Sequence, residues 1–210
     1  DTHMMERPDW IAEFSDSSIR PYLEPFVGGK KEILKQVDSA IKSFNERKSN
    51  KEIANKASKD FMSMKYKGWN GLGAFNASER KLANDLLGFE AYILFPTSAF
   101  NQVIAAKEEK VLLGGVQALN RGLATFREED KRMFPTAYVP LGAGPDIAKK
   151  FVDDAISMNF SVILIDTVAP TGQISFTHPD YDKFWAAVQE ADLAITLHVG
   201  ADGGYSPIPL

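Results

Sequence analysis

The spacing of apolar residues predicts helices in the first third of the chain. Two sets of apolar residues recur at helical spacing, first Ile33, Leu34, Val37, Ile41 and Phe44, then Ile53, Ala57 and Phe61. The lysines from Lys48 to Lys67 are mixed with acidic residues, so we interpret them as a solvated face and not as an anion-binding patch. The glycines between Gly68 and Gly73 then predict a loop.

From Asn76 onward, the pattern changes to short apolar strands that alternate with helices. Strands are expected at residues 91–95, 136–141, 161–165 and 194–199, and helices include residues 145–158 and 179–190. The strands are almost entirely apolar, as a parallel sheet covered on both faces requires. This alternation predicts an α/β fold, but it does not distinguish an open doubly wound sheet from a closed barrel.

Two helices of this second part can be described in more detail. Asn76 and Glu79 predict a capping box, and Gly88 predicts a C-cap. Between them, three leucines mark an apolar face: Leu82, Leu86 and Leu87. A later helix is expected to bury another set of apolar residues: Val116, Leu119, Leu123 and Phe126.

Composition narrows the class of protein. A chain of 210 residues with 44% hydrophobic residues suits one domain, residues 1–210, with a sizeable core. The net charge of -4 gives no basic field, so we expect neither nucleic acid nor an anionic membrane as a partner. The absence of cysteine excludes disulfides and thiolate chemistry and fits a cytoplasmic location. No apolar run approaches the roughly 18 residues of a membrane span.

Three residues are candidates for a metal site. Asp1 and His3 are two positions apart, so on a strand they would point to the same face. His198 ends an apolar strand, and functional side chains gather at that end of parallel strands. A carboxylate and imidazoles suit a divalent ion. His198 could equally be a core histidine that is satisfied by a backbone hydrogen bond.

Three further residues are candidates for substrate binding. Asp166 ends a strand and could bind substrate or cap a loop. His178 precedes Pro179, and we favour a helix-entry or capping role over a substrate contact. Glu6 could orient the ring of His3 or lie on the surface. The segment Gly142-Ala143-Gly144 is a poor match to a dinucleotide-binding loop, because the third glycine is missing.

Several of these segments together resemble the amidohydrolase superfamily, in the branch of aminocarboxymuconate-semialdehyde decarboxylase and aromatic-acid decarboxylases. The similar segments are Asp1-Thr2-His3 with Glu6 and Pro8, Leu87 to Pro96, Asn120 and Arg132 before Thr136 to Leu141, His178 to Trp185, and Leu197-His198-Val199-Gly200. The resemblance covers nearly the whole chain, and residues 12–75 are expected to be a helical insertion after strand one.

The resemblance implies a (β/α)₈ TIM barrel, of which this chain would hold about the first five βα units. It implies a divalent metal, zinc first and manganese second, held by Asp1, His3 and His198. The family's catalytic Asp and a further His would lie beyond residue 210, so we expect a fragment that is inactive alone. The implied activity is hydrolysis or non-oxidative decarboxylation of a small carboxylated molecule, and a homodimer is plausible. A different class stays open, a non-catalytic α/β module that binds a small molecule or nucleotide.

Overall fold

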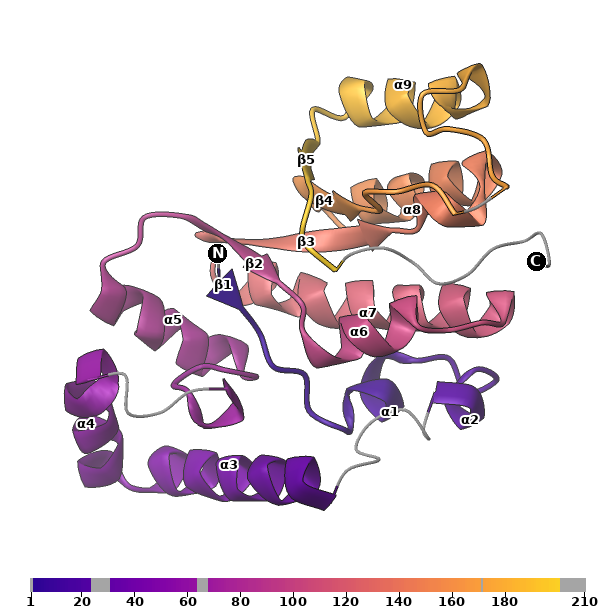
Figure 1. Ribbon diagram of the computed structural model, residues 1–210. Coiled ribbons are helices and arrows are strands. Elements are labelled where there is room, and N and C mark those ends of the chain that lie inside the picture. The colour runs from indigo at the N-terminus through magenta and orange to yellow at the C-terminus, as the bar shows by residue number, and fades with distance from the viewer. Residues whose placement is uncertain (1, 24–30, 64–67, 171, 201–210) are drawn as a thin grey trace.

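The computed structural model describes residues 2–23, 31–63, 68–170 and 172–200. Within this part, a parallel sheet of five strands is combined with helices (Figure 1). The strands are β1 (Thr2–His3), β2 (Tyr92–Phe95), β3 (Met133–Val139), β4 (Val162–Ile165) and β5 (Ala194–Thr196). The α-helices are α1 (Trp10–Phe14), α2 (Arg20–Leu23), α3 (Lys31–Ser49), α4 (Lys51–Asp60), α5 (Ala77–Leu87), α6 (Ser98–Ile104), α7 (Glu109–Glu129), α8 (Pro145–Ser157) and α9 (Asp182–Glu190). The α/β fold is therefore confirmed.

The order of the strands answers a question that the sequence left open. The order is β1-β2-β3-β4-β5, and every neighbouring pair is parallel. A doubly wound sheet reverses its strand order at a switch point, whereas here each strand lies beside the previous one. Because parallel crossovers are right-handed, this order places successive helices on the same side of the sheet. The sheet is thus singly wound over these strands.

The pairing changes partway along β3. Residues Met133 to Pro135 pair with β2, whereas Thr136 to Val139 pair with β4. Pro135 has no backbone N–H, so it cannot donate to a ladder. Past this point, Asn120 of α7 bonds the backbone of Tyr138, accepting from its N–H at 2.9 Å and donating to its carbonyl oxygen at 3.0 Å. The helix thus satisfies backbone groups that strand pairing leaves open.

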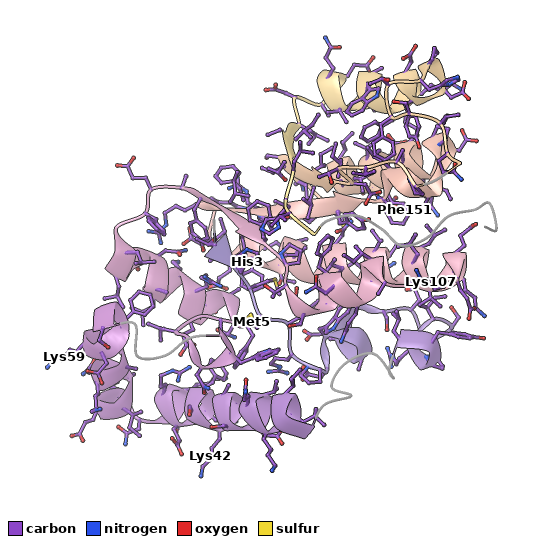
Figure 2. The ribbon with its side chains drawn as sticks, viewed as in Figure 1. His3, Met5, Lys42, Lys59, Lys107 and Phe151 are labelled. Carbon is purple, nitrogen blue, oxygen red and sulfur yellow. The ribbon has the colours of Figure 1, made fainter. Side chains whose placement is uncertain are left out.

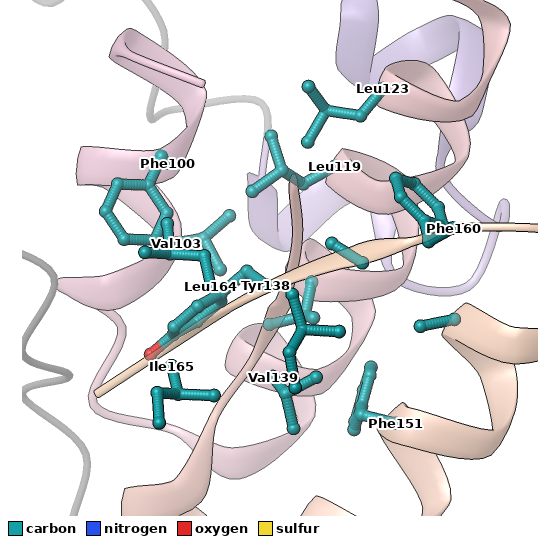
Figure 3. Close-up of a cluster of buried hydrophobic side chains, with 14 of the residues drawn as sticks. Phe100, Val103, Leu119, Leu123, Tyr138, Val139, Phe151, Phe160, Leu164 and Ile165 are labelled. Carbon is teal, nitrogen blue, oxygen red and sulfur yellow. The ribbon is translucent and has the colours of Figure 1, made fainter. Parts of the chain in front are cut away.

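The core lies between this sheet and the helices that follow β2 and β3. In α7, Val116, Leu119, Leu123 and Phe126 are all buried, which confirms the predicted face. Figure 3 shows Leu123 beside Leu119 within this core, with Phe151 of α8 beside Val139.

Two expectations about burial are wrong. The leucine face of α5 is not covered, because Leu82, Leu86 and Leu87 are each 38–40% exposed and the helix buries Ala83 and Asn84 instead. The last strand is not covered on both faces either. It ends at Thr196, Ile195 is 43% exposed and Leu197 is 65% exposed. As the last strand in the order, β5 has a strand neighbour on only one side among the described residues.

The predicted helical segment, residues 12–75, divides into two parts. The short helices α1 and α2 pack against α7, and Trp10 and Leu23 are buried there. The longer helices α3 and α4 lie farther out (Figure 1), and α4 buries no residue. Among the described helices, none combines the length and apolarity that crossing a membrane would require.

Candidate metal centre

Two of the three predicted metal ligands lie against each other. The ring of His3, at the end of β1, and the ring of His198, two residues after β5, have centroids 5.1 Å apart at an interplanar angle of 77°. Figure 2 places His3 in the middle of the molecule, near the ends of the strands. The two residues are 195 positions apart in the sequence.

This contact requires strong curvature across the strands and the segment after β5. β1 and β5 are the first and last strands in the order. A flat sheet with this order would hold them about 19 Å apart, at four strand spacings. The side chains of His3 and His198 could not reach ring contact over that distance. The ends of the sheet therefore curl toward each other.

The hydrogen bonds of both rings define the same tautomer. Nδ1 of His3 lies 3.2 Å from the carbonyl oxygen of Pro96 and 3.1 Å from Oγ1 of Thr97. Nδ1 of His198 lies 2.9 Å from the carbonyl oxygen of Val199. A carbonyl oxygen only accepts, so each Nδ1 must carry the proton. The lone pair of each neutral ring is then on Nε2, the arrangement that metal-binding histidines use.

The surroundings of His3 favour its neutral form. Burial lowers the pKa of His3, the bond to the Pro96 carbonyl opposes this, and His198 and Arg80 lower the pKa further. The ring of Phe95 packs against both imidazoles, with its centroid 5.7 Å from that of His3 and 4.9 Å from that of His198. A guanidinium N–H of Arg80 donates to the backbone oxygen of His3. A ligand histidine must be neutral, and this site supports that state.

Glu6 is buried and does not lie on the surface. It is 2% exposed, and its carboxylate accepts the backbone N–H groups of Thr97 at 2.8 Å, Ser98 at 2.6 Å and Ala99 at 3.1 Å. Burial raises the pKa of Glu6, and these backbone donors act against that rise. The carboxylate thus holds the first turn of α6, and Thr97 connects it to the ring of His3.

Asp166 is also buried within the protein, directly after β4. Its carboxylate accepts the hydroxyl of Tyr138 at 2.6 Å and the backbone N–H of Gly142 at 2.7 Å, and the residue is 2% exposed. A Cβ at Gly142 would lie 2.9 Å from Pro170, so only glycine allows this approach. These bonds tie the loop after β3 to the loop after β4. The role of Asp166 in substrate binding stays a prediction.

His178 lies at the start of the short helical turn Pro179–Tyr181. Its Nδ1 accepts the backbone N–H of Asp180 at 3.2 Å, so the favoured helix-entry role is present in the structure. The side chain is 46% exposed. A contact with substrate stays a prediction for this residue as well.

The donor chemistry of His3 and His198 fits one divalent ion. Zinc binds histidine nitrogen at about 2.1 Å, and the two rings that offer such nitrogens have centroids 5.1 Å apart. Among residues 2–23, 31–63, 68–170 and 172–200, no group of three His, Cys, Asp or Glu residues is arranged to hold an ion. Asp1, the third predicted ligand, lies outside the described residues.

Several contributors to this site were not predicted from the sequence. Phe95 is the last residue of β2, Pro96 and Thr97 follow it directly, and this position at the end of a parallel strand was a usable signal. Arg80 gave no such signal, because it lies in a helix whose apolar pattern proved misleading.

A cavity of about 320 Å³ lies beside the residues that follow β1. Its lining includes Met4, Glu6, Trp10 and Phe126, but neither His3 nor His198. The cavity therefore does not define a substrate site at the two histidines.

Comparison with known proteins gives little beyond this geometry. No family model matches the chain, and no curated protein matches it. Among solved structures, the chain is similar to a crystal structure of 2,6-dihydroxybenzoate decarboxylase complexed with 2,6-dihydroxybenzoate, with 15% identity and a TM-score of 0.49. The match covers 94% of this chain and 48% of that one, so the chain spans about half of its length. A likeness this distant supports no conclusion about activity.

Proposed function

We propose that this chain contributes two imidazole ligands to the divalent metal centre of an amidohydrolase-superfamily enzyme with a (β/α)₈ barrel. The observation that carries the proposal is the contact between His3 and His198, from opposite ends of the strand order. The sequential order of parallel strands and their curvature support a partial barrel. Asp1 remains the proposed third ligand, zinc the first choice of metal and manganese the second.

The proposed substrate is a small carboxylated molecule, and the reaction is hydrolysis or non-oxidative decarboxylation. A bound divalent ion would polarise a carbonyl or carboxylate oxygen and lower the pKa of a bound water. The chain's own residues would orient the ligands: carbonyl oxygens hold Nδ1 of His3 and His198, and Phe95 covers the two rings. A substrate panel that separates released carbon dioxide from released acid or amine distinguishes the two reactions.

The first prediction concerns zinc binding to the purified protein, measured by isothermal titration calorimetry. His3→Asn and His198→Asn are each expected to weaken zinc binding by more than about tenfold, because each removes a ligand. The matched control is His178→Asn, which changes the remaining histidine of the chain at an exposed position.

The control is expected to bind zinc like the unmodified protein. Unchanged affinity in His3→Asn and His198→Asn would contradict the proposal. So would an equal loss in His178→Asn, because that would show binding by surface histidines.

A further inference from the structure

Thr97 occupies the N-cap position of α6 but does not cap the helix. An N-cap threonine ordinarily accepts a backbone N–H of the first turn with its hydroxyl oxygen. Here the side chain of Thr97 makes no capping bond, and its backbone angles, φ -133° and ψ -85°, differ from those of an ordinary cap. Instead, its Oγ1 lies 3.1 Å from Nδ1 of His3.

The capping role is taken by a residue from a distant part of the chain. The buried carboxylate of Glu6 accepts the backbone N–H groups of Thr97, Ser98 and Ala99. Negative charge is favourable at the first turn of a helix, so Glu6 stabilises this turn without the help of Thr97. The hydroxyl of Thr97 is thereby available for His3.

The backbone bond from Thr97 to Glu6 also fixes where that hydroxyl lies. Its N–H donates to Oε1 of Glu6 at 2.8 Å, while its Oγ1 and the Pro96 carbonyl flank Nδ1 of His3. Since the carbonyl requires a proton on Nδ1, Oγ1 acts as a second acceptor for that proton. Both contacts keep the lone pair on Nε2.

We infer that Thr97 is a positioning residue that, together with the Pro96 carbonyl, holds the tautomer and orientation of His3 for metal binding, with Glu6 capping α6 in place of Thr97. This inference rests on the proposed function. It assigns to Glu6 a structural task in the site and does not require contact between Glu6 and a substrate. The metal ligand itself remains His3.

The test compares Thr97→Val, which keeps the shape and removes the hydroxyl, with Thr97→Ser, which restores it. Thr97→Val is expected to weaken zinc binding by about tenfold, the lower end for partners of a ligand histidine, because the Pro96 carbonyl remains. Thr97→Ser is expected to recover the affinity. The matched control is Thr177→Val, beside the exposed His178.

A second readout needs no metal. In ¹⁵N spectra of the imidazoles, Thr97→Val is expected to shift the Nδ1 and Nε2 signals of His3 and to leave those of His178 in place. If His3→Asn loses zinc but Thr97→Val keeps full affinity and an unchanged His3 spectrum, the inference is wrong and the proposed function stands. If His3→Asn binds zinc normally, the proposed function itself fails.

Discussion

The outer helices and the sheet region of this protein are stabilised by different means. We define the outer helices as α3 and α4 (Lys31–Asp60) and the sheet region as β2 to β5 with their helices (Tyr92–Thr196). In the sheet region, α7 alone buries eleven residues, whereas α4 buries none. Figure 2 shows Lys42 of α3 and Lys59 of α4 projecting away from the body of the protein.

The difference shows which interactions decide the position of each region. Apolar burial dominates in the sheet region, where Leu123, Phe151 and Tyr138 are fully buried. The outer helices bury less, because α3 buries Val37 and Ala40 and α4 buries no residue. A bidentate ion pair also joins Arg47 to Glu79. The candidate metal centre lies next to the sheet region, because β1 pairs with β2 and His198 follows β5.

The largest expected effect comes from one leucine in the sheet region. Leu123→Ala in α7, at 0% exposure, is expected to lower the free energy of unfolding by about 3 kcal/mol, from lost burial and the cavity left behind. Leu34→Ala in α3, at 38% exposure, is the matched control and is expected to cost less than about 1 kcal/mol. Urea unfolding measures both. Equal losses would mean that the two regions do not differ in packing.

A smaller effect is expected when the outer helices lose their ion pair. Nη2 of Arg47 donates to Oε2 of Glu79 at 3.0 Å, and both side chains are only 11% exposed. Arg47→Met leaves the carboxylate of Glu79 with the backbone N–H of Gly73 as its remaining bonded donor, so we expect a loss of about 2 kcal/mol. The exposed pair of Lys149 and Asp153 supplies the control.

Lys149→Met is expected to change stability by less than about 1 kcal/mol, because an exposed ion pair is screened by water. Hydrogen exchange identifies the region affected by Arg47→Met. Amide protection should fall in α3 and α4 and remain in α7. An equal fall in α7 would show that the outer helices and the sheet region unfold together.

The sequence predicted well those elements whose burial follows from their own pattern. The strands near residues 92–95 and 162–165 and the buried face of α7 were placed correctly, because continuous apolar runs or helical spacing specify them. The exposure of Leu82 and Leu197 was missed, since it depends on whether another element covers them. A local pattern cannot supply that information.

The candidate site shows the same limit. His3 and His198 were each singled out from strand-end positions, and their contact was expected only through the resemblance to a family. The Asn76 cap was predicted, but the carboxylate of Glu79 turned to Gly73 and Arg47 and not back to the cap. The link from Glu6 through Thr97 to His3 joins residues more than 90 positions apart. Such contacts depend on the fold and leave no trace in spacing.

The smallest expected effect tests the junction between α5 and the sheet region. Asp130, directly after α7, accepts hydrogen bonds from the side chain and backbone of Arg132, and these lower its pKa below the usual value. Arg132 also pairs with Asp85 of α5. Because the folded pKa lies below the unfolded one, the stability contributed by the Asp130 carboxylate is present above the unfolded pKa. It is lost as the pH falls through the folded value.

The Asp130→Asn variant is therefore expected to have a lower free energy of unfolding than the unmodified protein at about pH 7. The loss is expected to be smaller than that caused by Arg47→Met and to shrink as the pH falls to about 3. Urea unfolding across this range measures the difference, with Asp153→Asn as the control at an exposed pair. A gap that stays constant with pH would show that the charge of Asp130 does not stabilise the junction. In that case the attachment of α5 to the sheet region would depend on its packing and on the pair between Arg132 and Asp85, and not on Asp130.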